Sequence, residues 1–153
     1  MKKIGKILCA LLLFMFMTGC GSSKDVSGSL DEIMTKLYEG IPESNLPMGL
    51  SNTEITSDDI EYYVGTKDIK FDEAIVSESM VGSIAHSVVL LRVSDDESVS
   101  DVVKKIEDSA NPRKWICVEA EEVYVLNKGN LVVLIMSDTD RANAIKDNFN
   151  KIK

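Results

Sequence analysis

The stretch IAHSVVLLRV, residues 84–93, decides the fold because four consecutive residues at its centre are apolar. In an extended chain, successive side chains point to opposite faces, so Val88 and Leu90 share one face while Val89 and Leu91 share the other. A strand that is apolar on both faces is typical of the interior of a sheet. The sequence therefore predicts an inner strand at 84–93 around which the rest of the fold is arranged.

A helix is predicted directly after this strand. Ser98 and Asp101 have the spacing of a capping box, and Asn111-Pro112 ends the run. Between them, apolar residues recur at helical spacing, namely Val99, Val102, Val103 and Ile106. The segment VVLIMSDTDRANAIKDNF, residues 132–149, follows the same order of strand, Ser-Asp and helix. Two explanations stay open: a worn internal duplication, or the ordinary way in which strands lead into helices.

The C-terminal third predicts a hairpin and a last helix. Two apolar strands, 123–126 and 131–136, are joined across NKGN, where Gly129 can adopt the positive φ of a tight turn. Asp138 or Thr139 then caps a helix whose core-facing residues are Ala142, Ile145, Phe149 and Ile152.

Before residue 84 the pattern is less regular. Ser29 and Glu32 form a capping box for an amphipathic helix that Gly40 ends. Residues 41–59 are rich in Pro, Ser, Asn and Asp and predict a loop, with Met48 and Leu50 packed into the core.

Two further strands are expected in this half, at 60–64 from the alternation of Ile60, Tyr62 and Val64, and at 74–79. The prediction is a single α+β domain over residues 30–153, with a mainly antiparallel sheet of four to five strands and helices packed on one face.

The N-terminus has the order of an export signal. Lys2, Lys3 and Lys6 precede an apolar run from Ile7 to Met17, which is short for a membrane span. The residues Met17-Thr18-Gly19-Cys20 resemble the lipobox of bacterial lipoproteins. This resemblance implies that residues 1–19 are a lipoprotein signal peptide and that Cys20 carries a diacylglyceryl anchor. Residues 20–29 are then the lipidated cysteine and a flexible, small and polar tether.

Charge excludes one class of partner. The chain has 153 residues with 17 basic and 25 acidic side chains, a net charge of −8, and loss of the three signal lysines makes it more acidic. Such a domain is repelled by nucleic acid and by anionic headgroups, so no nucleic-acid partner is expected and the acyl anchor alone supplies the contact with the membrane.

Cysteine and histidine are scarce. Cys9 leaves with the signal and Cys20 is predicted to be acylated, so Cys117 is left alone in the domain, where WICV predicts a buried, inert thiol. His86 is the only histidine, and the sequence favours a packed, hydrogen-bonded role for it. The alternative is a general base working with a carboxylate, for which Glu78 on the neighbouring strand is the candidate.

No cofactor or metal is predicted. The acidic clusters Asp95-Asp96-Glu97 and Asp138 with Asp140 do not fit a calcium-binding loop, and both lie where helices begin, so capping is expected. No G-x-S-x-G, phosphate-binding glycine loop or CxxC occurs, so no catalytic residue is assigned.

One stretch combines positive charge with an aromatic residue in this acidic domain. Arg113, Lys114 and Trp115 are the candidate binding patch, because Arg and Trp are favoured at interfaces. The alternative is a loop whose Trp115 folds inward.

Taken together, the lipobox, LDEIMTKLYEGI, YYVG, IVSESMVGSIAHSVVLLRV and KGNLVVLI resemble a family of small lipoproteins of Gram-positive bacteria known as domain of unknown function 4358. The likeness covers most of residues 20–153 and implies location and fold. The expected function is a lipid-anchored binding or interaction module at the extracytoplasmic face of the cell membrane, with an envelope protein or a small ligand as partner. The alternatives are a small envelope hydrolase using His86 and an accessory ligand-binding subunit of a transporter.

Overall fold

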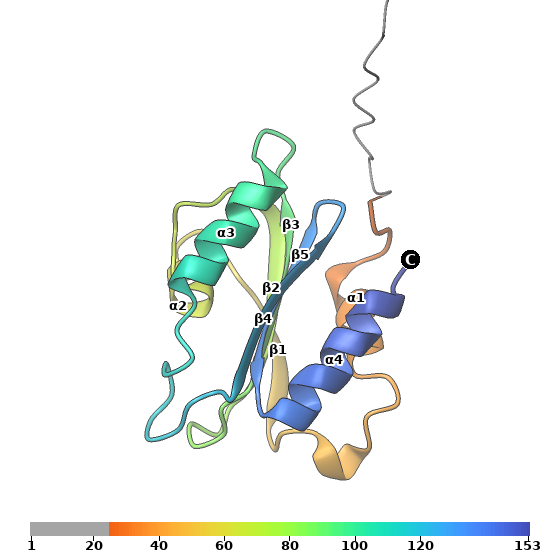
Figure 1. Cartoon of the computed structure of the whole chain (residues 1–153), viewed down its shortest axis with the longest axis vertical. Helices are drawn as coiled ribbons and strands as arrows, with labels where there is room; N and C mark the ends of the chain where they lie inside the picture. Colours follow the sequence, from red (N-terminus) through yellow and green to blue (C-terminus); the bar gives the residue numbers. More distant parts are fainter. Residues whose placement is uncertain (1–24) are drawn as a thin grey trace, which may run out of the picture.

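The computed structural model describes residues 25–153. Their α+β fold is built on one antiparallel sheet of five strands in the order β1-β2-β3-β5-β4 (Figure 1). The strands are β1 (Leu50–Glu54), β2 (Phe71–Ser79), β3 (Ser87–Val93), β4 (Glu122–Lys128) and β5 (Leu131–Ser137). The helices are α1 (Leu30–Leu37), α2 (Ile60–Val64), α3 (Val99–Ser109) and α4 (Thr139–Lys151), with a short 3-10 turn at Glu43–Asn45. The antiparallel sheet and the inner position of β3 confirm the predicted fold class.

The helices cover both faces of the sheet, and the prediction of helices on one face is wrong. Helices α1 and α4 cover one face, and α2 and α3 cover the other (Figure 1). The reason lies in β3 and β5, whose inner residues are fully buried on both faces. Burial of one such Val or Leu side chain contributes roughly 1.5–3 kcal/mol, so each face needs its own layer of helices.

The predicted helix starts are confirmed. Ser29 accepts a hydrogen bond from the backbone N–H of Glu32, and the Glu32 side chain returns one to Ser29, so α1 begins with a complete capping box. Ser98 caps α3 and Asp138 caps α4 in the same side-chain-to-backbone manner. The expected capping by Asp95-Asp96-Glu97 is wrong for α3, because Asp96 pairs instead with Lys70.

Residues 60–64 form a helix, so the strand predicted there is wrong. Ile60 and Val64 are both buried, while Tyr62 between them is 58% exposed, as expected of one turn with a single apolar face. Gly65 ends the helix at φ 86°, and a Cβ at this position would lie 1.9 Å from the backbone oxygen of Ser109. The chain therefore turns where only glycine fits, against the end of α3.

A strand also lies inside the predicted loop of residues 41–59. β1 pairs with β2 from Leu50↔Ser79 to Glu54↔Ile75 and forms one edge of the sheet. Its outer half is exposed and polar, which explains why no apolar alternation marks it. Met48 is 74% exposed, so its predicted place in the core is wrong.

The predicted hairpin is confirmed. β4 and β5 pair from Glu122↔Ser137 to Lys128↔Leu131, and the turn between them has Gly129 at φ 56°. A positive φ at the first turn residue matches the twist of the flanking strands.

The predicted tether is shorter than residues 20–29. Val26 is 3% exposed and belongs to the core beneath α1 and α4. The Arg92 guanidinium donates to the carbonyl oxygens of Val26 and Gly28, both at 2.7 Å. Residues 26–29 are therefore part of the domain, and residues 20–24 of the predicted tether, with Cys20, lie outside the described residues.

Candidate functional site

Polar side chains gather at the end of the sheet where β2 finishes and β3 begins. Glu78 pairs with Ser87 in the register of these strands, and His86 directly precedes β3. Because side chains alternate between faces, His86 and Ser77 point toward the α1/α4 face, while Glu78 and Ser87 point toward the α2/α3 face. Two separate polar clusters therefore lie back to back.

The first cluster surrounds His86, which has no solvent exposure. Its Nε2 lies 2.8 Å from the Tyr38 hydroxyl of the α1 C-cap, and its Nδ1 lies 2.9 Å from Ser137 Oγ at the end of β5. Burial, and then the nearby Arg141 charge, lower the His86 pKa to about 3. The imidazole is therefore neutral at ordinary pH, and its two hydrogen bonds tie α1 to the sheet.

Arg141 connects this cluster to the surface. Its guanidinium pairs with Asp138, lies 3.4 Å from Ser137 Oγ, and donates through Nε to the carbonyl oxygen of Asn45 at 2.8 Å. The first turn of α4 is thereby held against the 3-10 turn. This network closes the His86 cluster from the side of α4.

The second cluster surrounds Lys114, which was predicted to belong to an exposed binding patch. Its side chain is 5% exposed, and Nζ lies 2.8 Å from Glu78 Oε1 and 3.2 Å from Ser87 Oγ. The rings of Tyr62, Tyr63 and Trp115 stand around the ammonium group, with centroids 4.9, 5.1 and 5.3 Å from Nζ. Burial lowers the pKa of Lys114, and the contact with Glu78 opposes that shift.

The predicted patch of Arg113, Lys114 and Trp115 does not form one surface. Lys114 points inward, Trp115 is half-buried against the α2/α3 core, and Arg113 alone is exposed and pairs with Glu119. The sequence did not reveal the direction of Lys114, because its partners Glu78 and Ser87 lie on β2 and β3, far from the Lys114 loop in the chain.

Two other predictions about chemistry are corrected. Cys117 is exposed, with φ 63°, because the loop after α3 turns outward at this residue and leaves the apolar run WICV without a strand. Glu78 cannot assist His86, because the two side chains lie on opposite faces of the sheet and Glu78 is paired with Lys114.

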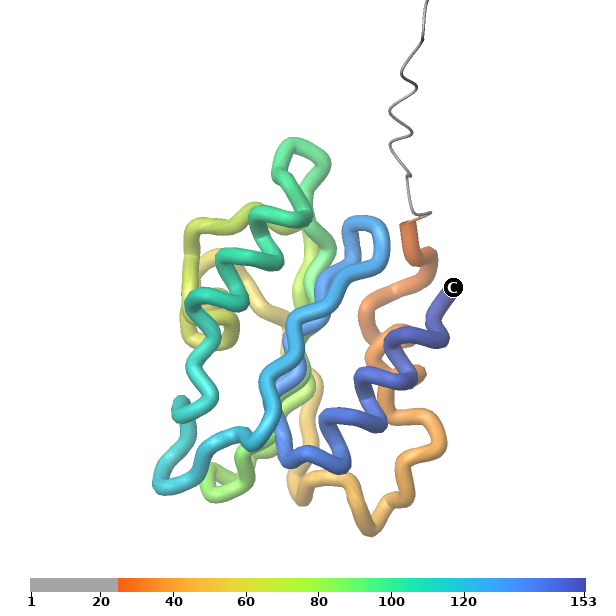
Figure 2. Tube along the Cα trace, viewed as in Figure 1, coloured from red at the N-terminus to blue at the C-terminus, as the bar shows by residue number. Residues whose placement is uncertain are grey.

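Three loops meet at the same end of the molecule. Figure 2 shows the segments 46–49, 80–86 and 112–121 at the end opposite the N-terminus of the described chain. The first two segments are joined by the Met80 N–H, which donates to the Gly49 oxygen at 3.0 Å, and by Ser79 Oγ at the end of β2, which donates to the Met48 oxygen at 2.8 Å. A groove of about 390 Å³ runs between them.

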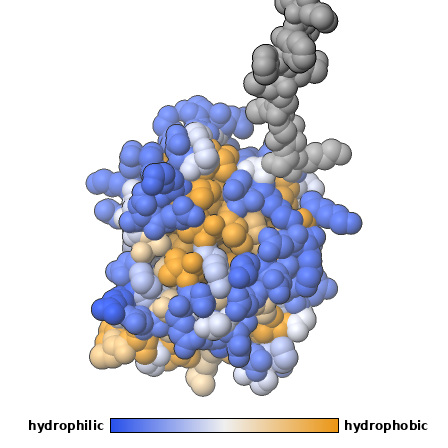
Figure 3. Space-filling model, viewed as in Figure 1, coloured by the Kyte–Doolittle hydropathy of each residue, from blue (hydrophilic) through white to orange (hydrophobic). Residues whose placement is uncertain are grey.

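At this end of the molecule, large apolar side chains are exposed to solvent. Met48, Met80 and Ile116 are 74%, 77% and 77% exposed. We call these three residues, with the groove beside them, the tip surface. Figure 3 shows apolar residues along the lower edge of the molecule, where these loops lie. The groove adds apolar walls at Ile84 and Val118 and charged rims at Glu121, Asp138 and Arg141. The sequence did not predict this surface, since Met48 was expected to pack into the core from its loop and Ile116 was placed in the apolar run WICV.

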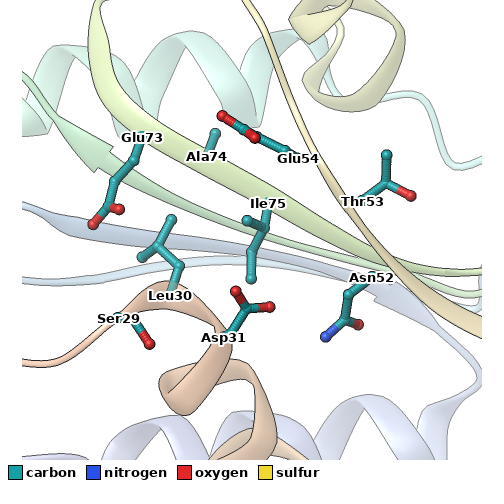
Figure 4. Close-up of a pocket in the computed structure, with 9 residues that line it drawn as sticks. All are labelled: Ser29, Leu30, Asp31, Asn52, Thr53, Glu54, Glu73, Ala74 and Ile75. Atoms are coloured by element: carbon teal, nitrogen blue, oxygen red, sulfur yellow. The ribbon is translucent and has the colours of Figure 1, made fainter.

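A second cavity, of about 320 Å³, lies between the start of α1 and strands β1 and β2. In Figure 4, Leu30 and Ile75 lie in the middle of the view with Asp31 and Asn52 below them, while Glu54 lies across the β2 ribbon from Leu30 and Asp31. Six of its nine lining residues are polar or charged and only Leu30, Ala74 and Ile75 are apolar, so it lacks the mainly apolar walls that are typical of a binding pocket.

Residues 25–153 contain neither a metal-binding cluster nor a membrane-spanning helix. No three His, Cys, Asp or Glu side chains in this range come together to hold a metal ion. No helix of the described part has the length and apolar content to cross a membrane. In comparisons with known proteins, no family model, curated protein or solved structure matches the chain.

Proposed function

We propose that this chain is a lipid-anchored binding module on the extracytoplasmic face of a bacterial cell membrane. In this proposal, Cys20 carries the anchor and the tip surface docks another envelope protein. The partner is held by apolar contacts from Met48, Met80 and Ile116, with orientation supplied by the charged rim of the groove.

The observation that carries the proposal is the exposure of three large apolar side chains at one end of an acidic domain. Single exposed apolar residues are common, but several in neighbouring loops that border one groove are typical of a protein interaction site. Met48 lines the groove itself, and Met80 and Ile116 lie in the other two loops that border it. Methionine suits such a surface because its flexible thioether adapts to the shape of a partner. Removal of these side chains from water on docking provides the driving force.

The location of the N-terminus supports the same arrangement. The described chain begins at the end of the molecule opposite the tip surface (Figure 2). An anchor at Cys20, five residues before the first described residue, Asp25, therefore leaves the tip surface directed away from the membrane. Two acyl chains hold a protein stably at a membrane, so the domain needs no lipid affinity of its own.

His86 offers less support for an enzyme. Both of its ring nitrogens are occupied by hydroxyl groups, and the ring is fully buried. A general base needs access to its substrate, which this environment denies. The first cluster is best explained as an internal clamp beneath the tip surface.

The proposal is tested by capture of partners from membranes of cells that express the full chain. Proteins are crosslinked chemically, and those recovered with the wild-type chain are compared with those recovered with a Met80→Ser/Ile116→Ser variant. We expect at least one envelope protein to be lost from the variant. The matched control is Asp95→Ser/Asp96→Ser, which changes two exposed residues before α3 at the other end of the domain. Equal recovery by all three chains contradicts a docking role for the tip surface.

A further inference from the structure

The two edges of the sheet differ in chemistry. β1 is short, and its outer residues Asn52, Thr53 and Glu54 are polar and exposed, which discourages pairing with another strand. β4 is longer and its centre is apolar, with Val123 38% exposed and Tyr124, Val125 and Leu126 half-buried. In Figure 1, β4 faces the viewer between α3 and α4, and Figure 3 shows a band of apolar residues at this place.

The outer backbone of β4 is available for pairing. In an antiparallel ladder, hydrogen-bonded and non-hydrogen-bonded pairs alternate, and the pair next to a two-residue turn is hydrogen-bonded. Since Lys128↔Leu131 closes the hairpin, the backbone groups of Val123, Val125 and Asn127 point away from β5. Within residues 25–153, no other segment forms backbone hydrogen bonds with these outward groups.

We propose that β4 pairs antiparallel with β4 of a second copy of this chain, centred on Val125, so that one continuous sheet runs through both copies. This inference goes beyond the proposed docking function and does not depend on it. It uses the edge of the sheet, whereas the tip surface lies at the end of the strands.

The charges of β4 argue for a second copy as the occupant. Glu122 and Lys128 stand at equal distances from Val125 in opposite directions along the strand. Antiparallel pairing about Val125 therefore places Glu122 of each copy opposite Lys128 of the other, on the same face of the sheet. A shift of the register loses both pairs.

Both charged groups have capacity for this contact. Lys128 Nζ donates to the carbonyl oxygens of Asn150 at 2.8 Å and Ile152 at 2.5 Å, which leaves one of its three hydrogens. Glu122 accepts only a long contact, 3.4 Å, from Thr139 Oγ1.

The pairing is tested by disulfide crosslinking of the full chain in membranes, in a Cys117→Ser background. At the centre of the proposed pair, Val125→Cys brings two Cα atoms to about 5.5 Å, within the range that a disulfide spans. Mild oxidation should then yield a covalent dimer on a non-reducing gel. The matched control is Thr53→Cys on the β1 edge, and the Cys117→Ser chain alone controls for Cys9 and Cys20. A Val125→Cys chain that crosslinks no more than Thr53→Cys overturns the proposal.

Charge reversal tests the register. In the Val125→Cys chain, Glu122→Lys or Lys128→Glu replaces attraction by repulsion at both ends, and each should lower the crosslinked fraction about tenfold. When the two variants are expressed together, every contact between unlike copies is again a Glu–Lys pair, so the mixed dimer should recover. Failure of the mixture to recover, with both chains retaining a cooperative thermal transition, overturns the proposal. If the Lys128→Glu chain loses its cooperative thermal transition, the test rests on Glu122→Lys alone. Undiminished crosslinking of the Glu122→Lys chain then contradicts the proposed register.

Discussion

The two polar clusters at the end of the sheet both keep polar side chains inside the fold, but they do so with different chemistry. Both are buried, and they are built from neighbouring residues, His86 in one and Ser87 in the other. The His86 cluster is neutral and depends on hydrogen bonds to Tyr38 and Ser137, whereas the Lys114 cluster keeps an ion pair with Glu78 inside a wall of aromatic rings. Because successive side chains of a strand point to opposite faces of the sheet, adjacent residues can lie in two different environments.

The largest effect is expected at the charged cluster. Lys114→Met removes the ammonium and leaves Glu78, whose side chain is 19% exposed, without its cation. A buried charge that loses its partner typically costs about 3 kcal/mol of unfolding free energy or more. Urea denaturation should show this loss. The double variant Lys114→Met/Glu78→Met should recover much of the lost stability. No recovery would mean that packing, not charge, determines the stability of the Lys114 cluster.

The contribution of the neutral His86 cluster to the free energy of unfolding should depend on pH. His86 has a pKa of about 3 in the folded chain, against 6.5 when unfolded, so below pH 6.5 the unfolded chain binds a proton that the folded chain does not. Its contribution to stability is complete above pH 6.5 and is lost as pH falls toward 3, by about 2 kcal/mol at pH 5.

The measurement is the free energy of unfolding at pH 7.5 and pH 5 for the wild type and for His86→Gln, which cannot titrate. The wild type should lose about 2 kcal/mol more than the variant over this interval. Parallel pH profiles for the two chains would show that His86 is protonated in the folded state as easily as in the unfolded one.

A smaller effect is expected from the hydroxyl that holds α1. Tyr38→Phe keeps the ring and removes the 2.8 Å hydrogen bond to His86 Nε2. Loss of one such bond costs about 1 kcal/mol. Thermal unfolding should show the loss. If the hydroxyl helps to keep the imidazole neutral, an NMR titration of the variant should also give a changed pKa for His86. Unchanged stability would mean that the hydrogen bond between Tyr38 and His86 does not help to hold α1 on the sheet.

The smallest effect is expected from the aromatic wall. Tyr62→Leu removes a ring that is 58% exposed and stands 4.9 Å from Lys114 Nζ. A cation–π contact of this kind contributes about 0.5–1 kcal/mol. In the Lys114→Met background, the same substitution should have almost no effect on urea denaturation. An equal effect in both backgrounds would assign Tyr62 to packing alone.

The fold class and the local features of the chain could be predicted from the sequence, whereas the packing of the helices on the sheet could not. The caps at Ser29 and Asp138 and the turn at Gly129 depend on residues close in the chain, and all three are confirmed. Residues 60–64 were misassigned because Ile60, Tyr62 and Val64 fit both a strand and one helical turn. The side of the sheet on which each helix packs is not encoded in the helix's own periodicity.

The candidate site was even less accessible to sequence reasoning. The direction of Lys114 is set by Glu78 and Ser87 on two strands, and the tip surface arises from three loops that are far apart in the chain. Exposed methionines in a loop, such as Met80 beside Gly82 and Ser83, were the one sequence feature that could have indicated it.

The central claim, binding at the end opposite the anchor, is tested most directly by a photoreactive amino acid at single positions of the full chain in living cells. At Ile116 the probe lies on the tip surface, and at Asp95 it lies at the other end of the domain. Illumination should yield a discrete crosslinked product with an envelope protein from position 116 and none from position 95. A product from position 95 with none from position 116 would contradict the account.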